Sequence, residues 1–234
     1  MQTLADSTWE DAAALADRVL VVPLGAVEQH GPHLPLTTDL EIAAALGVWL
    51  AETLPEAVVL APPIPFGASG EHQGFSGTLS VGQEAIEYLL LELGRSATCT
   101  WRRVLFLSAH GGNVAPVQRA VRQLLAEGRD VRAWTPAWHG DAHAGFVETS
   151  VMLALRPRSV ELDAARAGAT APLSELMPRL VREGVAAVSP NGVLGDPAGA
   201  SAATGERLLD DALASLMAVI TGWEASAERG GRAA

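Results

Sequence analysis

VLVVPLGAVEQHGPHLPLTTDLEIA (residues 19–43) is the stretch that decides the fold. Its first seven residues are apolar and include three β-branched valines, which predicts a strand buried on both faces of a sheet. A polar loop follows, and apolar residues then recur at helical spacing from Asp39 to Leu54, which predicts a helix. Strand, loop and helix in this order form the repeating unit of α/β proteins.

The same unit recurs along the chain. Further strands are expected at 57–64, 104–108 and 130–134, and helices at 82–98, 114–127 and 146–155, after a first helix capped by Ser7 or Thr8. A helix over 171–183, a loop over 189–205 and a last helix over 206–225 follow. This order predicts one α/β domain over 1–234 with a largely parallel sheet and a frayed tail from about 226.

Three expectations concern packing. The helix over 82–98 is expected to turn Ala85, Tyr88, Leu89 and Leu93 toward the core. The helix over 114–127 is expected to turn its apolar face, which includes Leu125, toward the core as well. Cys99 is expected to be a buried structural thiol.

Composition excludes several classes of protein. The net charge of −11 argues against nucleic acid and anionic membrane surfaces as partners. All 16 basic residues are arginines, so a Schiff-base lysine is excluded. A single cysteine leaves no intramolecular disulfide, and neither a signal-peptide pattern nor a run of 18 apolar residues is present, which predicts a cytoplasmic protein.

The six histidines all lie in four glycine-rich segments. These are EQHGPH (His30, His33), GEHQG (His72), SAHGGN (His110) and WHGDAHAG (His139, His143). Each segment follows one of the four expected strands, and ligands of open α/β sheets bind beyond the carboxyl ends of strands. The four loops are therefore expected to converge on one site, where imidazole and carboxylate groups suit a first-row divalent cation.

Several single residues carry this metal hypothesis. Glu28 and His30 are two apart and share a face of an extended backbone. Asp39 begins a helix, so it is either an N-cap or a metal ligand able to bridge two ions. His33 is either a ligand or a residue that orients one. His110 leaves a buried strand directly, and a satisfied core histidine is its alternative.

Other candidates surround these residues. Asn113 is a helix cap or a site residue, and Glu148 is a dipole-stabilising first-turn residue or a ligand. Ser69, Glu71 and His72 lie in GASGEHQGFSGT, whose glycines allow a close approach of the backbone to a substrate. This segment lacks the nucleophile elbow of serine hydrolases, and no phosphate-binding glycine pattern follows a strand.

The motifs E-x-H-G-x-H-L-P with a following Asp39, H-G-G-N (110–113) and H-A-G-x-x-E-T-S (143–150) resemble the creatininase family of metal-dependent amidohydrolases. The resemblance covers about residues 8–225. It implies a three-layer α/β/α sandwich, a homo-hexamer and two divalent ions per subunit, with zinc, manganese or iron(II) as suitable metals.

The resemblance also implies ligands and roles. Glu28, Asp39 and His110 would hold one ion, and His30 with the bridging Asp39 the other. Creatininase has a glutamate ligand two residues after the histidine that corresponds to His110, whereas this chain has Gly112 there. Glu148 is the expected substitute. His143 is the candidate general acid for the leaving amine.

Within the family, GASGEHQGFSGT and GVAAVSPNGVLGDP resemble the peptidase branch of the mycofactocin system, which trims a C-terminal Val-Tyr dipeptide from a modified precursor peptide. Two alternatives remain: a small-molecule amidohydrolase (a cyclic amidase or formamide deformylase) and a non-catalytic metal-binding assembly protein. A peptidase would need a basic residue for the terminal carboxylate, for which Arg95, Arg102 and Arg103 are candidates.

Overall fold

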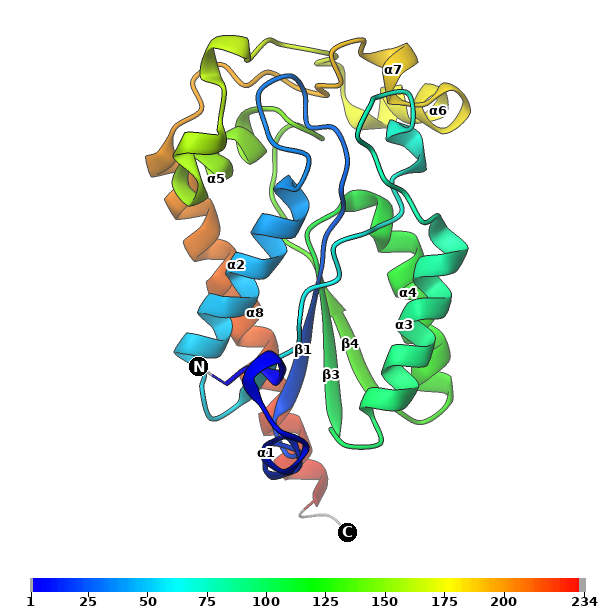
Figure 1. Ribbon diagram of the computed structural model, residues 1–234, viewed down its shortest axis with the longest axis vertical. Helices are drawn as coiled ribbons and strands as arrows, with labels where there is room; N and C mark the ends of the chain where they lie inside the picture. Colours follow the sequence, from blue (N-terminus) through cyan, green and yellow to red (C-terminus); the bar gives the residue numbers. More distant parts are fainter. Residues whose placement is uncertain (1, 232–234) are drawn as a thin grey trace.

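The computed structural model describes residues 2–231 and has a parallel sheet of four strands at its centre (Figure 1). The strands are β1 (Val19–Leu24), β2 (Val58–Leu60), β3 (Arg103–Ser108) and β4 (Asp130–Trp134), in the order β2-β1-β3-β4. Val19 pairs with both Val58 and Arg103, so the strands start level with one another. Their carboxyl ends therefore open on the same edge of the sheet.

Helices cover both faces of this sheet (Figure 1). One layer contains α2 (Thr38–Thr53), α5 (Phe146–Leu155) and α8 (Ala202–Gly231), and the other contains α3 (Gln83–Ala97) and α4 (Val114–Ala126). Alternate residues of β1 serve the two cores: Val19 and Val21 pack in the first, and Leu20 and Val22 in the second. The result is the predicted α/β/α sandwich.

The shorter elements lie at the two ends of the sheet. The helix α1 (Trp9–Ala14) is near the amino ends of the strands, and α6 (Leu173–Glu183) with α7 (Val185–Val188) lies at the carboxyl end (Figure 1). Thr8 caps α1 through a capping box with Asp11, which confirms one of the two expected caps. Across the described part of the chain, no helix combines the length and apolarity needed to cross a membrane.

Two elements differ from the prediction by more than two residues. The second strand ends at Leu60 rather than at 64, because Pro62 and Pro63 have no N–H to donate to a neighbouring strand. The last helix starts earlier, at Ala202, and continues to Gly231 through the first part of the predicted frayed tail. Residues 232–234 of that tail lie outside the described residues.

Three packing expectations are wrong. The buried face of α3 is formed by Ile86, Leu90, Gly94 and Ala97, one position round from the predicted face, and Tyr88 is 67% exposed. Apolar residues occur all round this helix, so their spacing did not identify the inner face. Leu125 of α4 is exposed as well. Cys99 is exposed because it lies in the turn after α3 ends.

Candidate metal centre

The loops that follow the four strands converge above the carboxyl edge of the sheet, as predicted. They bring together six polar side chains that are all buried: Glu28, His30, Asp39, His72, His110 and His143. Burial of this many ionisable groups is costly unless they are paired or bind a cation. The cluster is therefore a site rather than a part of the apolar core.

Asp39 lies between two histidines. Its Oδ1 is 3.4 Å from His30 Nε2, and its Oδ2 is 3.3 Å from His110 Nδ1. The residue that precedes α2 as N-cap is Thr37, and Asp39 lies in the first turn. Its carboxylate thus faces the cluster with both oxygens, which is the arrangement that a bridging carboxylate requires.

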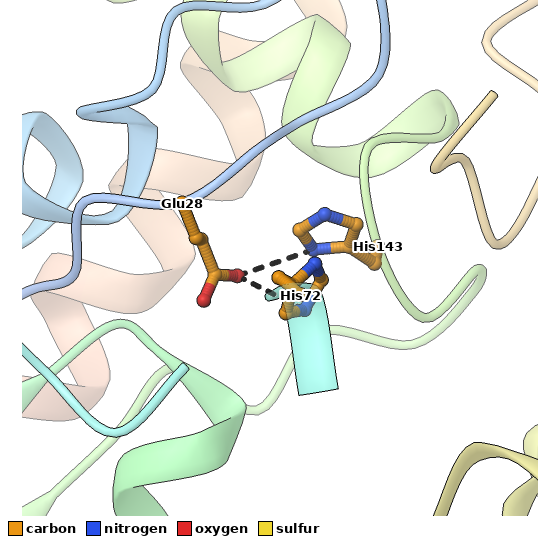
Figure 2. Close-up of side chains that lie close together, drawn as sticks. All are labelled: Glu28, His72 and His143. Atoms are coloured by element: carbon orange, nitrogen blue, oxygen red, sulfur yellow. Dashed lines mark ion pairs between the residues drawn. The ribbon is translucent and has the colours of Figure 1, made fainter. Parts of the chain in front are cut away.

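Glu28 is the second centre of contacts. Its Oε1 lies 3.3 Å from His72 Nε2 and 3.7 Å from His143 Nδ1, as Figure 2 shows. Its Oε2 lies 3.2 Å from His110 Nε2. Glu148, in the first turn of α5, places Oε2 3.9 Å from His143 Nδ1 and the same distance from His30 Nε2.

These residues fit a divalent cation. Three groups have ligand atoms that all lie within 4.8 Å of one another: Glu28 with Asp39 and His110, His30 with His143 and Glu148, and Glu28 with His72 and His143. Among the described residues, both oxygens of Glu28, Asp39 Oδ2 and His30 Nε2 are buried without a hydrogen-bond partner. Buried nitrogen and oxygen atoms with free lone pairs at this spacing suit zinc, manganese or iron.

Backbone carbonyls determine which nitrogen of three rings carries a proton. Each ring places one nitrogen on a carbonyl oxygen, which can only accept a hydrogen bond. The pairs are His30 Nδ1 with Glu28 O at 3.1 Å, His110 Nε2 with Ala68 O at 2.9 Å, and His143 Nε2 with Gln29 O at 2.8 Å. The other nitrogen of each ring faces a carboxylate of the cluster, as in metal-binding histidines, and His110 Nε2 in addition lies 3.2 Å from Glu28 Oε2.

Electrostatics match a cation site. Burial lowers the pKa of His30, but the neighbouring Asp39 carboxylate outweighs it and raises that pKa to about 10. Burial also lowers the pKa of His110, but the carboxylates of Glu28 and Asp39 outweigh burial and raise that pKa to about 10. The two imidazolium groups in turn lower the pKa of Asp39 against the effect of its burial. The metal-free cluster therefore holds protons where a metal ion would supply positive charge.

The pKa values of Glu28, Glu148 and His143 are shifted in the direction that favours the neutral form of each group. Burial raises the pKa of Glu28 to about 7, with His110 opposing the rise. Burial also raises the pKa of Glu148. Burial and the charge of His30 lower the pKa of His143 well below its usual range.

Three predicted site residues support the cluster from outside it. His33 Nε2 lies 2.8 Å from Thr149 Oγ1. Asn113 occupies the N-cap position of α4, but its side chain makes no capping hydrogen bond there. Its side chain accepts from Ala68 N and donates to Gly25 O, which joins the loops after β1, β2 and β3. Ser69 places Oγ 3.4 Å from His110 Nε2.

The structure explains the glycine at position 112. A Cβ on Gly112 would lie 2.2 Å from Ala68 O, 2.5 Å from His110 Nε2 and 2.8 Å from Glu71 Oε1. A glutamate side chain at this position has no room. The half-buried Glu71 belongs to none of the three possible ligand groups among the described residues, whereas Glu148 belongs to one.

Gln29 was missed by the sequence prediction. It lies between two predicted ligands, yet its buried amide contacts both His72 and His143. In an extended backbone, side chains alternate between two faces, so Gln29 was expected to point away from Glu28 and His30 and was not predicted to belong to the site. The loop around Gly192, which contacts the amide, gave no periodic pattern to indicate its place in the site.

The three candidate arginines are a further correction. Arg103 begins β3, at the amino edge of the sheet, and donates to Asp17 O. Arg102 precedes it, and Arg95 is paired with Glu92 and Glu127 near the end of α3. These side chains lie at the end of the molecule opposite the cluster, so they cannot receive a substrate carboxylate there.

Comparisons with known proteins agree with this site. The sequence model of the creatininase family, described as creatinine amidohydrolase, matches residues 5–220. The mycofactocin precursor peptide peptidase of Mycobacterium ulcerans (strain Agy99) is 51% identical over 226 residues, which cover 93% of this chain and 87% of the relative.

Solved structures have the same fold. One named "Creatininase Mn" is 25% identical with a TM-score of 0.80 and covers 93% of this chain and 96% of its own. A mutant creatininase of Zn-Zn type is 24% identical with a TM-score of 0.79 and the same coverage. With the family match over most of its length and a relative at this identity, the chain belongs to the creatininase family.

Proposed function

We propose that this hydrolase is a divalent-metal-dependent peptidase that removes a C-terminal Val-Tyr dipeptide from a modified precursor peptide in mycofactocin biosynthesis. The observation that carries the proposal is the buried cluster of imidazoles and carboxylates in a chain 51% identical to a mycofactocin precursor peptide peptidase. Family membership supports hydrolysis of an amide bond. The choice of substrate rests on the relative's name.

Two ions are proposed to occupy the cluster. Glu28, Asp39 and His110 would hold one, and His30, Asp39 and Glu148 the other. The two oxygens of Asp39 face different histidines, which supports a shared carboxylate. When bound, the ions would supply a hydroxide nucleophile near neutral pH and polarise the scissile carbonyl.

His143 is proposed to move the proton. Its Nε2–H is held by Gln29 O, so the lone pair of Nδ1 faces the cluster. Nδ1 can take a proton from the nucleophile and then deliver it to the leaving amine as the general acid. The Glu148 carboxylate, 3.9 Å from Nδ1, would stabilise the transient imidazolium. Ala144 N holds that carboxylate in place by donating to Oε2 at 2.6 Å.

A homo-hexamer in the cytoplasm is the proposed setting. The exposed apolar side chains of Trp9 and Tyr88 support burial between subunits. Light scattering on the purified protein gives the mass of the assembly, and a monomer would refute this part of the proposal.

Mass spectrometry of the metal-loaded protein with a peptide ending in Val-Tyr tests the function. Release of the intact dipeptide, blocked by a chelator, is expected. The alternative is a small-molecule amidohydrolase, which the description of the matching family as creatinine amidohydrolase favours. Turnover of creatinine or a formamide without peptide cleavage would establish that alternative.

A further inference from the structure

The side-chain amide of Gln29 has one possible orientation. Its Oε1 lies 2.8 Å from the backbone N–H of Gly31, which can only donate. Its Nε2 lies 3.0 Å from the carbonyl oxygen of Gly192, which can only accept. An exchange of the oxygen and nitrogen would set donor against donor and acceptor against acceptor, so the assignment follows from the backbone.

This orientation fixes the proton on His72. The second hydrogen of Gln29 Nε2 points to His72 Nδ1, 2.8 Å away, so Nδ1 must be the acceptor. The 3.1 Å contact between Gln29 Nε2 and His143 Nε2 joins two nitrogens whose hydrogens already serve other acceptors. A neutral His72 that accepts at Nδ1 carries its hydrogen on Nε2. That nitrogen faces Glu28 Oε1 at 3.3 Å (Figure 2).

His72 is thus reversed relative to the other histidines of the cluster. His30, His110 and His143 donate to backbone carbonyls and turn their other nitrogen toward a carboxylate of the cluster, where it can bind a metal once it carries no proton. His72 accepts from outside and turns an N–H inward. A ligand needs a lone pair directed at the metal, and the hydrogen bond from Gln29 removes it from Nε2.

We propose that His72 is not a metal ligand but a positioning residue: its protonated Nε2, 3.3 Å from Oε1 of Glu28, orients that carboxylate electrostatically and leaves Oε2 to bind the metal. The proposal rests on the metal site of the proposed function, but on neither its substrate nor its reaction. The proposal excludes the group of Glu28, His72 and His143 as a metal site, although the distances between their ligand atoms would allow it to hold an ion.

The surroundings of Gln29 are built for this role. A Cβ on Gly192 would lie 1.8 Å from Gln29 Oε1, and the φ of +81° at Gly192 favours glycine. Thr78 contributes a second restraint, because its hydroxyl donates to the carbonyl of His72 at 3.1 Å. The amide and the imidazole are therefore held in one geometry before any metal binds.

Metal binding to variants tests the proposal without substrate. His72→Leu and Gln29→Leu should still bind the full number of zinc ions per subunit at saturating zinc, with affinity lowered about 10–100-fold. His72→Gln, which keeps an N–H near Nε2, should recover most of that affinity. The exposed His139→Gln is the matched control and should change neither number nor affinity. Loss of one ion per subunit in His72→Leu and His72→Gln would overturn the proposal.

A measurement on the unaltered protein keeps the test independent of how variants fold. Long-range ¹H–¹⁵N spectra of the zinc-loaded protein report the protonated nitrogen of each histidine. His72 should show a hydrogen on Nε2 and a free, hydrogen-bonded Nδ1, whereas His30 and His110 should show metal-bound nitrogens. A metal-bound Nε2 on His72 would refute the proposal. A protein that binds zinc in this way yet fails to cleave the peptide would refute only the proposed function.

Discussion

Gly112 lies directly under the carbonyl of Ala68, so that a Cβ on Gly112 would come within 2.2 Å of that oxygen. The same Cβ would come within 2.5 Å of His110 Nε2. Neither the backbone of the loop after β2 nor the buried imidazole of His110 can move freely. We predict that Gly112→Ala destabilises the protein by about 1–3 kcal/mol, as overpacking does, and displaces His110. Thermal unfolding and metal content measure the two effects.

The neighbouring glycine is the control for this substitution. A Cβ on Gly111 meets nothing within 4 Å, although Gly111 belongs to the same turn. Gly111→Ala should therefore keep the stability, metal content and activity of the original protein. Equal behaviour of the two variants would contradict the steric argument.

Metal binding should release protons. In the metal-free protein the pKa values of His30 and His110 are raised to about 10, so both rings are charged at neutral pH. A metal ion takes the place of the protons on the inward nitrogens, and its affinity therefore rises with pH until those pKa values are reached. Each displaced proton should strengthen binding about tenfold per pH unit.

Titration of zinc into weakly buffered metal-free protein with a pH indicator measures the release. Affinities obtained by competition with a chelator between about pH 6 and about pH 8 give the slope. Affinity that does not depend on pH, with no acid released, would mean that His30 and His110 are neutral before the metal binds.

The sequence predicted the position of the site because strand order and loop order carried the information. Glu28 and His30 lie in the loop that follows β1, and His110 lies two residues after the end of β3, so the carboxyl edge of the sheet brings the three together. Ligand chemistry followed from residue type. The contacts between Glu28, His30 and His110 depend on the topology of the sheet, which the alternation of strands and helices in the sequence specifies well.

Contacts between loops were beyond such prediction. Gln29 and Gly192 are far apart in the chain, and their pairing depends on backbone turns without periodicity. The inner face of α3 failed for a related reason, since Tyr88 and Leu90 are both apolar enough for a core and only packing separates them. Hydrophobicity alone ranks the faces of a helix poorly when its apolar residues spread over more than one face.

Cys99 should react readily in the folded protein. It is exposed after the end of α3, and its Sγ lies 3.4 Å from Arg95 O. We expect one thiol per chain to be labelled by a disulfide reagent without denaturant, and peptidase activity to persist because the metal cluster lies at the other edge of the sheet. Labelling only after denaturation would indicate that an assembly interface covers this thiol.

His30 and His143 should separate metal binding from proton transfer. His30→Ala removes a nitrogen that faces Asp39 at 3.4 Å, so bound metal and activity should fall together. His143→Ala removes the Nδ1 proposed to carry the proton, and should lower kcat about 10²–10⁴-fold while metal content is kept. The exposed His139→Ala should change neither quantity. Metal loss in His143→Ala would instead make Nδ1 a ligand, and full metal content in His30→Ala would remove His30 from the metal site.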